Sequence, residues 1–121
     1  MSQEYEKQIK YEKQMKKGVL EILVLKLLSQ EEKYGYQLIS ELKERSGGMF
    51  SLKEGTLYPI LYRLEEDGLV ESRWSEAKGK EISRKYYRIT KKGMKALEEK
   101  KEEWRLFTKK VNDMVCGTSP A

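Results

Sequence analysis

The 121-residue sequence contains no histidine and only one cysteine, and these two scarcities exclude several kinds of site. A lone cysteine, Cys116, cannot form an internal disulfide, and without histidine the chain has no plausible ligand set for a structural zinc ion. The absence of histidine also removes the commonest general base and every catalytic triad that depends on it. We therefore expect no metal, no cofactor and no enzymatic activity.

Long apolar runs are missing as well. The N-terminus is polar and charged, unlike a secretory signal peptide, and no stretch approaches the roughly 18 apolar residues that a membrane span requires. The most apolar segment, residues 19–28, is interrupted by Glu21 and Lys26. These features predict a cytoplasmic protein that does not bind membranes, with residues 19–28 as the buried central helix of a single domain.

Charged residues are abundant, at 37% of the chain, and they are unevenly distributed. Between Arg73 and Lys95 there are nine basic and two acidic residues, a net charge of +7, whereas the whole chain carries +5. A concentrated positive charge favours a polyanionic partner, and nucleic acid is the first candidate. The alternative is a lysine-rich surface that only interacts with solvent.

Residues 51–70 have the periodicity of an amphipathic helix. Leucines and an isoleucine fall on one stripe, and the opposite face carries tyrosines, an arginine and a threonine. Ser51 and Glu54 have the spacing of a capping box, which predicts that the helix starts at Leu52, and Gly68 is suited to end it. We expect one face to pack and the other to contact a partner.

The flanking segments give this helix a context. A preceding helix with Leu38 and Leu42 facing inward leads to a glycine-containing connector at residues 47–50. After Gly68 the periodicity changes to two, which predicts a β-hairpin with the tip A-K-G-K, anchored on the helices by Trp74, Tyr87 and Ile89. This order predicts a winged helix-turn-helix, in which the second helix enters the major groove of DNA.

The last predicted helix, residues 91–116, is longer than a domain of this size needs for its own core. Thr90 is a good N-cap, and the helix would extend about 39 Å at about 1.5 Å per residue. A heptad-like apolar seam predicts pairing with a second copy. The seam residues are Leu97, Trp104, Phe107 and Val111. The alternative is that the stripe folds back on its own domain.

Four sequence pieces resemble the PadR-like transcriptional regulators, in particular the compact subgroup that ends in a single C-terminal helix. In order, they are GVLEILVLKLL, YGYQLISEL, EGTLYPILYRLEEDGLV and RKYYRITKKG. The third piece is the most specific, because G-T-L-Y-P ahead of R-L-E-E-D-G-L is particular to this family. The resemblance covers roughly residues 18–110.

The resemblance implies a homodimer that binds a palindromic operator and usually represses transcription until a small-molecule or stress signal releases it. Dimerisation would use the C-terminal helix with help from the N-terminal one, which contributes Tyr5 and Ile9. An effector would bind at or near the dimer interface. Trp104 and Phe107, meeting their symmetry mates, could line an apolar pocket for a small hydrophobic or aromatic effector, although simple dimer packing is an equal alternative.

We therefore expect a mainly α-helical fold with a small β-hairpin. The predicted divisions are an N-terminal helix over residues 1–17, a winged helix-turn-helix DNA-binding domain over 18–90, a dimerisation helix over 91–116 and a tail over 117–121. The function class weighed against a DNA-binding regulator is a winged helix that serves as a protein-interaction scaffold. That class predicts a neutral or acidic hairpin and no arginine on the helix of residues 51–70, and this sequence has neither feature. We call the predicted hairpin the wing and the helix of residues 51–70 the reading helix.

Candidate DNA-binding residues lie on the reading helix and the wing. They are Ser51, Lys53, Thr56, Tyr58, Tyr62, Arg63, Lys78, Lys80 and Arg84. Arginine can pair with guanine edges, hydroxyls and cations can reach phosphates, and the helix start can hold a phosphate at the positive end of its dipole. The alternative for Tyr58 and Tyr62 is partial burial against a neighbouring helix, and for the wing lysines it is a solvated loop.

Overall fold

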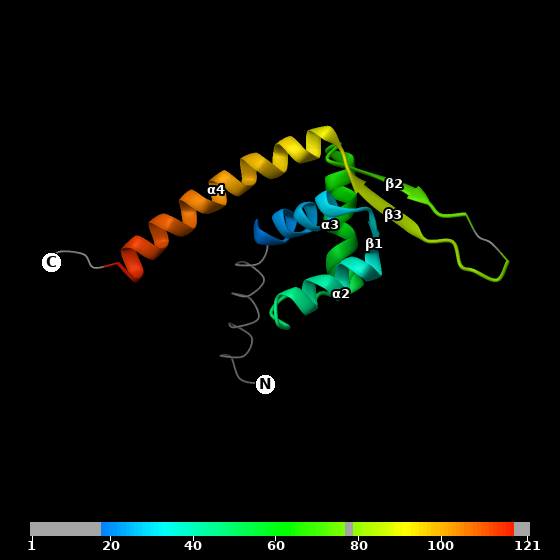
Figure 1. Ribbon diagram of the computed structural model, residues 1–121, viewed down its shortest axis with the longest axis horizontal. Coiled ribbons are helices and arrows are strands. Elements are labelled where there is room, and N and C mark those ends of the chain that lie inside the picture. The colour runs from blue at the N-terminus through cyan, green and yellow to red at the C-terminus, as the bar shows by residue number, and fades with distance from the viewer. Residues whose placement is uncertain (1–17, 77–78, 118–121) are drawn as a thin grey trace.

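The computed structural model describes residues 18–76 and 79–117 of the chain (Figure 1). Its elements are the helical residues 18–30, β1 (Lys33–Tyr34), α2 (Gly35–Arg45), α3 (Glu54–Glu66), β2 (Val70–Trp74), β3 (Lys85–Ile89) and α4 (Lys91–Val115). This mainly helical arrangement with a small antiparallel sheet confirms the predicted fold class. The helix predicted over residues 1–17 lies outside the described residues.

The hydrophobic core lies where the helix of residues 18–30, which we call the core helix, meets α2 and α3. Val24 and Leu25 of the core helix are fully buried, as are Leu38 of α2 and Leu57 of α3. Burying a leucine side chain contributes roughly 1.5–3 kcal/mol, so this leucine-rich contact supplies much of the driving force for folding. Residues 19–28 thus form the buried central helix that their composition predicts.

The sheet contains the predicted hairpin and one strand that the sequence did not predict. The strand order is β1-β3-β2, all antiparallel, and the hairpin register pairs Val70 with Ile89 and Trp74 with Lys85. The unpredicted strand, β1, has two residues, Lys33 and Tyr34, which pair with β3. Two residues are too few to show an alternating pattern, and Lys33 has a polarity typical of a loop.

Lys33 is nevertheless buried, because two carboxylates accompany it. Its Nζ lies 3.0 Å from Glu31 Oε1 and 3.1 Å from Glu41 Oε2, although burial by itself would disfavour a charged lysine. Desolvation lowers the pKa of Lys33, but the hydrogen bonds and charges of Glu41 and Glu31 outweigh it, and the net effect is a raised pKa. This ion cluster fixes β1 next to the start of α2.

The hairpin anchor differs in part from the prediction. Tyr87 is completely buried and Ile89 is packed against the core, as expected. Trp74, by contrast, is 64% exposed, so the prediction that it anchors the hairpin was wrong. It pairs with Lys85 at the end of β2 that leads into the wing loop.

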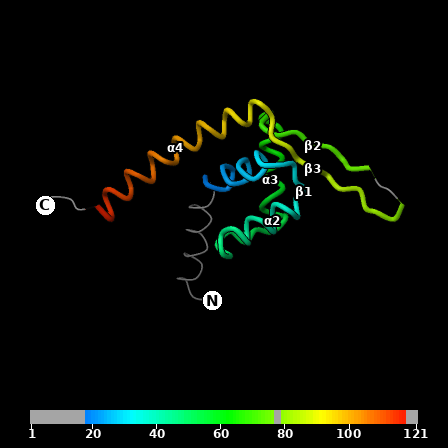
Figure 2. Tube along the Cα trace, in the orientation of Figure 1, coloured from blue at the N-terminus to red at the C-terminus, as the bar shows by residue number. Residues whose placement is uncertain are grey.

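The long helix α4 begins inside the domain and then leaves it (Figures 1 and 2). The Thr90 hydroxyl accepts a hydrogen bond from the Gly93 N–H at 3.0 Å, which confirms the predicted N-cap. Leu97, one turn further on, is only 1% exposed and belongs to the core. The rest of α4 extends past the start of the core helix, as the tube in Figure 2 shows.

Candidate nucleic-acid interface

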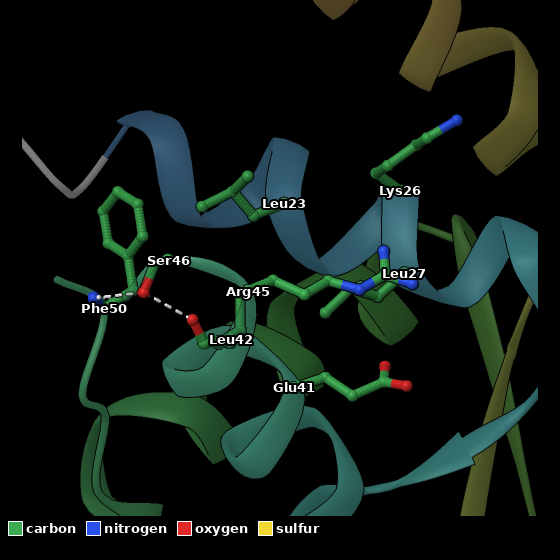
Figure 3. Close-up of a pocket in the computed structure, with 8 residues that line it drawn as sticks. All are labelled: Leu23, Lys26, Leu27, Glu41, Leu42, Arg45, Ser46 and Phe50. Atoms are coloured by element: carbon green, nitrogen blue, oxygen red, sulfur yellow. Dashed lines mark hydrogen bonds between the residues drawn. The ribbon is translucent and has the colours of Figure 1, made fainter. Parts of the chain in front are cut away.

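A tight turn sets the angle between α2 and α3. The Ser46 hydroxyl donates to the Leu42 carbonyl at 2.6 Å and accepts from the Phe50 N–H at 2.9 Å (Figure 3). Gly47 and Gly48 have φ values of 61° and 89°, which residues with a side chain rarely adopt. The predicted glycine connector is therefore a specific turn of a helix-turn-helix, closed by one serine.

The start of α3 differs from the prediction. The helix begins at Glu54 with Lys53 as its N-cap residue, and no side chain caps it, so the predicted capping box of Ser51 and Glu54 and the start at Leu52 were wrong. Lys53 has extended backbone angles, and its carbonyl accepts from the Thr56 and Leu57 N–H groups. Glu54 instead places a negative charge in the first turn, which suits the helix dipole but disfavours a phosphate there.

The two faces of α3 are separated as the sequence predicts. Leu57, Ile60, Leu61 and Leu64 are buried. The exposed residues are Glu54, Gly55, Thr56, Pro59, Tyr62, Arg63 and Glu66. The exposed face therefore carries a hydroxyl-bearing group near the start of the helix and another two turns later, on a helix that is fixed from behind.

The two tyrosines of α3 differ in burial. Tyr62 is 55% exposed, whereas Tyr58 is half-buried against the start of α2. A Cβ atom added at Gly35 would lie 2.5 Å from the Tyr58 hydroxyl oxygen, so Gly35 makes room for this ring. Burial raises the pKa of Tyr58, with smaller contributions from Glu54 and Tyr62, and its hydroxyl stays protonated at neutral pH. Tyr58 thus also packs, as the alternative interpretation held.

Arg63 has a partner within the protein. Its Nη2 lies 2.7 Å from Glu21 Oε1 of the core helix, and Glu21 Oε2 in turn lies 3.7 Å from Nζ of Lys100 in α4. Glu21 thereby links α3 to two other helices. This ion pair holds Arg63 toward the core helix, which competes with the predicted pairing of Arg63 with a base.

The basic segment of the wing contains cations of two kinds. Arg73 pairs with Glu32, and Arg88 pairs with Glu71. Arg84 instead donates from Nη1 to the Tyr34 hydroxyl at 2.9 Å and lies 4.5 Å from the centre of that ring. The wing tip turns at Gly79, with a φ of 63°, and the adjoining Lys80 is exposed. Its predicted partner in DNA binding, Lys78, lies outside the described residues.

Three side chains next to the α3 face were not among the sequence candidates. Tyr36 and Trp74 are exposed, and Lys85 is half-buried with its Nζ 5.7 Å from the centre of the Tyr62 ring. Tyr36 comes close because β1 carries the start of α2 to the edge of β3, whereas Trp74 and Lys85 are placed by the hairpin. These approaches join segments that are distant in the chain, so no local pattern grouped the three residues with α3.

The predicted dimer seam divides into two parts. Leu97 is buried in the domain's own core, so it is not available to a partner, and its assignment to the interface is corrected. Trp104, Phe107 and Val111 are exposed, and the Trp104 and Phe107 rings lie 5.9 Å apart. Tyr5 and Ile9 of the predicted seam lie outside the described residues.

A groove of about 580 Å³ runs between the start of the core helix and the distal part of α4. Its lining is mainly apolar and includes Val19, Ile22, Trp104, Phe107 and Val111. The structure therefore brings the two predicted effector residues, Trp104 and Phe107, to the wall of a groove within one chain.

Residues 24–99 match the sequence profile of the transcriptional regulator PadR-like family. The chain belongs to this family of DNA-binding transcriptional regulators. The match includes α2, α3, the wing and the start of α4, which are the elements that build the candidate interface. The family resemblance of the sequence motifs is thereby confirmed.

Solved structures show the same fold. A transcriptional regulator from Clostridium thermocellum is 33% identical and superimposes with a TM-score of 0.78 over 84% of this chain and 98% of that one. A PadR-like regulator from Bacillus cereus is 41% identical, with a TM-score of 0.73 over 84% of this chain and 96% of that one. The matched region covers almost the whole length of both solved structures, so they share the arrangement of the PadR-like domain and its long helix.

The negative transcriptional regulator PadR of Bacillus subtilis is a more distant relative. It is 33% identical over 79 residues, which make up 65% of this chain and 43% of that protein. Its structure in complex with operator DNA superimposes with a TM-score of 0.60 at 32% identity, over 67% of this chain and 45% of that one. The chain thus spans less than half the length of this relative.

In the described parts of this PadR-like regulator, no helix combines the length and the apolar character that crossing a membrane requires.

Proposed function

We propose that this PadR-like regulator is a homodimeric repressor that binds a palindromic operator in double-stranded DNA and is released by a small-molecule or stress signal. The observation that carries the proposal is the exposed face of α3, which presents hydroxyl groups beside a basic wing while the opposite face is buried. The Bacillus subtilis relative has been solved with operator DNA, which supports an operator as the partner here.

In this proposal residues 18–90 form the DNA-binding unit, and α3 enters the major groove. Thr56 and Tyr62 face the bases or the flanking phosphates from the exposed side of α3, with Ser51 and Lys53 ahead of the helix. The hydroxyl of Tyr58 reaches the DNA from the edge of the same face. Arg63 acts differently, because its pair with Glu21 assigns it to holding α3 in position.

The wing supplies contacts that do not depend on sequence. Lys80 and Lys78 at the tip, with Arg84 nearer the sheet, approach the phosphate backbone next to the groove that α3 occupies. Such contacts set the register of the protein on the duplex and make its binding depend on salt. The base contacts of α3 then provide the preference for one operator.

Two copies pair through the distal part of α4 within residues 91–116, aided by the N-terminal segment with Tyr5 and Ile9. Trp104, Phe107 and Val111 are large apolar side chains that remain exposed on one stripe, and tryptophan is a frequent anchor of interfaces. An effector would enter the groove beside Trp104 and Phe107. Its apolar lining suits a small hydrophobic or aromatic molecule that alters the spacing of the two copies.

The experiment is a fluorescence anisotropy titration with duplexes that tile the promoter of the protein's own gene, together with a random duplex. We expect one duplex with a dyad repeat to bind at least about a thousandfold more tightly than random DNA, as specific regulators do. Changing Lys78→Glu with Lys80→Glu should weaken binding to both duplexes about equally and flatten the salt dependence.

Binding that shows no preference among duplexes would contradict a sequence-specific repressor. An unchanged salt slope in the double variant would remove the wing tip from the DNA contacts. Failure of the wild-type protein to bind any duplex would favour the protein-interaction scaffold.

A further inference from the structure

The cations of the wing differ in how their charge is balanced. Arg73 and Arg88 each pair with a carboxylate, whereas Arg84 and Lys85 have no acidic partner within the described ranges 18–76 and 79–117. Lys85 Nζ lies 5.7 Å from the centre of the Tyr62 ring and 5.5 Å from that of Tyr87. Aromatic rings attract a cation without neutralising it. Two adjacent positive charges therefore stay uncompensated at one place.

Both cations border a hollow of about 420 Å³, which we call the wing-root hollow. It lies where the start of α2, the side of α3 and the base of the wing meet, and its lining contains no carboxylate. Besides Arg84, the lining includes Tyr36, Tyr58, Tyr62, Trp74, Lys85 and Tyr87. A positive hollow lined with hydroxyl groups and aromatic rings is suited to an anion that carries an apolar part.

One hydroxyl of the lining has no hydrogen-bond acceptor among the described residues. Tyr87 is completely buried, and its hydroxyl group makes no hydrogen bond there. Burial raises the pKa of Tyr87 to about 12, so the group is a donor at neutral pH. A buried donor without an acceptor costs free energy, and such groups are uncommon in folded proteins. Tyr87 thus places an unpaired hydroxyl donor in the wall of the wing-root hollow.

The position of the wing-root hollow indicates which anion would bind there. When α3 occupies the major groove and the wing reaches the next minor groove, the strand between the two grooves must cross the surface between α3 and the wing. The wing-root hollow occupies that surface. The start of α2, whose first turn holds no acidic residue, adds backbone N–H groups to the same side.

We infer that the wing-root hollow binds one sugar–phosphate unit of a DNA strand, with Lys85, Arg84 and the tyrosine hydroxyls on the phosphate and Trp74 against the deoxyribose. This inference rests on the proposed DNA-binding function and adds Tyr36, Trp74 and Lys85 to its contacts. Part of the affinity for the phosphate then comes from neutral hydrogen-bond donors. Neutral donors add affinity without releasing counterions, so their effect is separable from that of the cations.

The test measures operator affinity by anisotropy at several salt concentrations for the full chain and two variants. Lys85→Gln should weaken binding and reduce the salt slope by about 0.9 per half-site, the value of one phosphate contact on B-DNA, because each of the two copies loses one contact. Tyr36→Phe should weaken binding by about 3- to 10-fold with an unchanged slope, since it removes a neutral hydrogen bond. Thermal unfolding of each variant verifies that the fold is intact.

The matched control is Arg88→Gln, which removes the same charge from the same strand outside the hollow. We expect Arg88→Gln to change the slope much less than Lys85→Gln, because Arg88 is already paired with Glu71. Equal slopes for the two variants would mean that only the general field of the wing matters, and would overturn the inference.

Tryptophan emission provides an independent readout. The change in emission on adding operator should be largely lost in Trp74→Phe, because Trp104 lies on α4 away from the hollow. A change that persists in Trp74→Phe would remove Trp74 from the site. If the wild-type protein binds no DNA, the proposed function fails with the inference. If it binds while Lys85→Gln and Tyr36→Phe bind equally well, only the hollow is excluded.

Discussion

Single residues decide how closely the elements of this PadR-like regulator approach one another. Gly93 lies in the first turn of α4, where the helix crosses the end of the hairpin. A Cβ atom added there would lie 2.6 Å from Ile89 Cγ1 and would overlap the Leu69 carbonyl group. The Leu69 carbonyl also accepts from the Thr90 N–H at 3.0 Å, so this backbone cannot easily move.

We predict that Gly93→Ala lowers the free energy of unfolding by about 1–3 kcal/mol, the usual cost of overpacking a closely packed contact. Urea unfolding followed by circular dichroism would measure it. Gly55→Ala is the matched control, because a Cβ at Gly55 has nothing within 4 Å. Because Gly55 lies in the first turn of α3 with a backbone that alanine can adopt, this exchange should raise stability by about 0.4–1 kcal/mol. Equal effects of the two substitutions would show that contact at Gly93 is not limiting.

At the scale of elements, α3 is held by contacts on three sides. The Ser46 turn fixes its approach from α2, Tyr58 packs against Gly35, and Arg63 pairs with Glu21 of the core helix. Glu21 also lies near Lys100, so α3 and α4 share a partner beside the groove that contains Trp104. A helix restrained in this way presents its exposed face at a fixed angle.

We predict that Arg63→Gln and Glu21→Gln each weaken operator binding by a similar, small factor, and that the double variant is no weaker than either single one. The reason is that both substitutions break the same pair, which as a partly exposed contact is worth about 0.2–1 kcal/mol. A double-mutant cycle in anisotropy titrations measures the coupling. A much larger loss for Arg63→Gln alone would instead place Arg63 on the DNA.

At the scale of the whole molecule, α4 is too long for one domain. Its first turns complete the core through Leu97, and its distal part exposes Trp104, Phe107 and Val111 next to an open groove. Exposed apolar patches of this kind usually mark interaction sites. A second copy paired through this stripe would place two α3 helices at a fixed distance, as a palindromic operator requires.

We predict that Trp104→Glu converts a dimer into a monomer at micromolar concentration, as measured by sedimentation velocity. Operator affinity should fall by at least about a hundredfold, because the second half-site contact is no longer intramolecular. Lys109→Gln is the control, since it changes the net charge by the same amount on the opposite face of α4, where Lys109 pairs with Asp113. A Trp104→Glu protein that remains dimeric would exclude this stripe as the interface.

Local patterns determined most of the fold. The leucine spacing of the core helix, α2 and α3, the glycines of the turn, the alternation in the hairpin and the Thr90 cap each predict structure over a few neighbouring residues, and the structure has them. The polar face of α3 was predictable for the same reason, because helical periodicity alone places Thr56 and Tyr62 opposite the buried leucines.

Other features depended on contacts between distant segments. Strand β1 exists because β3 pairs with it and two carboxylates balance the charge of Lys33. Its two residues alone do not have a pattern that predicts a strand. Trp74 was expected inside and lies outside, since its alternation with Val70 is correct but it borders an open hollow beside α2 and α3 instead of the core. The pairing of Arg63 with Glu21 likewise joins residues far apart in the chain.

The sequence by itself therefore determined the family, the order of the elements and the face of α3 that stays exposed, because each follows from the residues of one short segment. The tertiary structure decided which cations keep their charge free. Arg73, Arg84, Lys85 and Arg88 look alike in the sequence, but only folding brings carboxylates to the first and last of them and aromatic rings to the other two. Charge compensation depends on distances in space, which a sequence pattern does not contain.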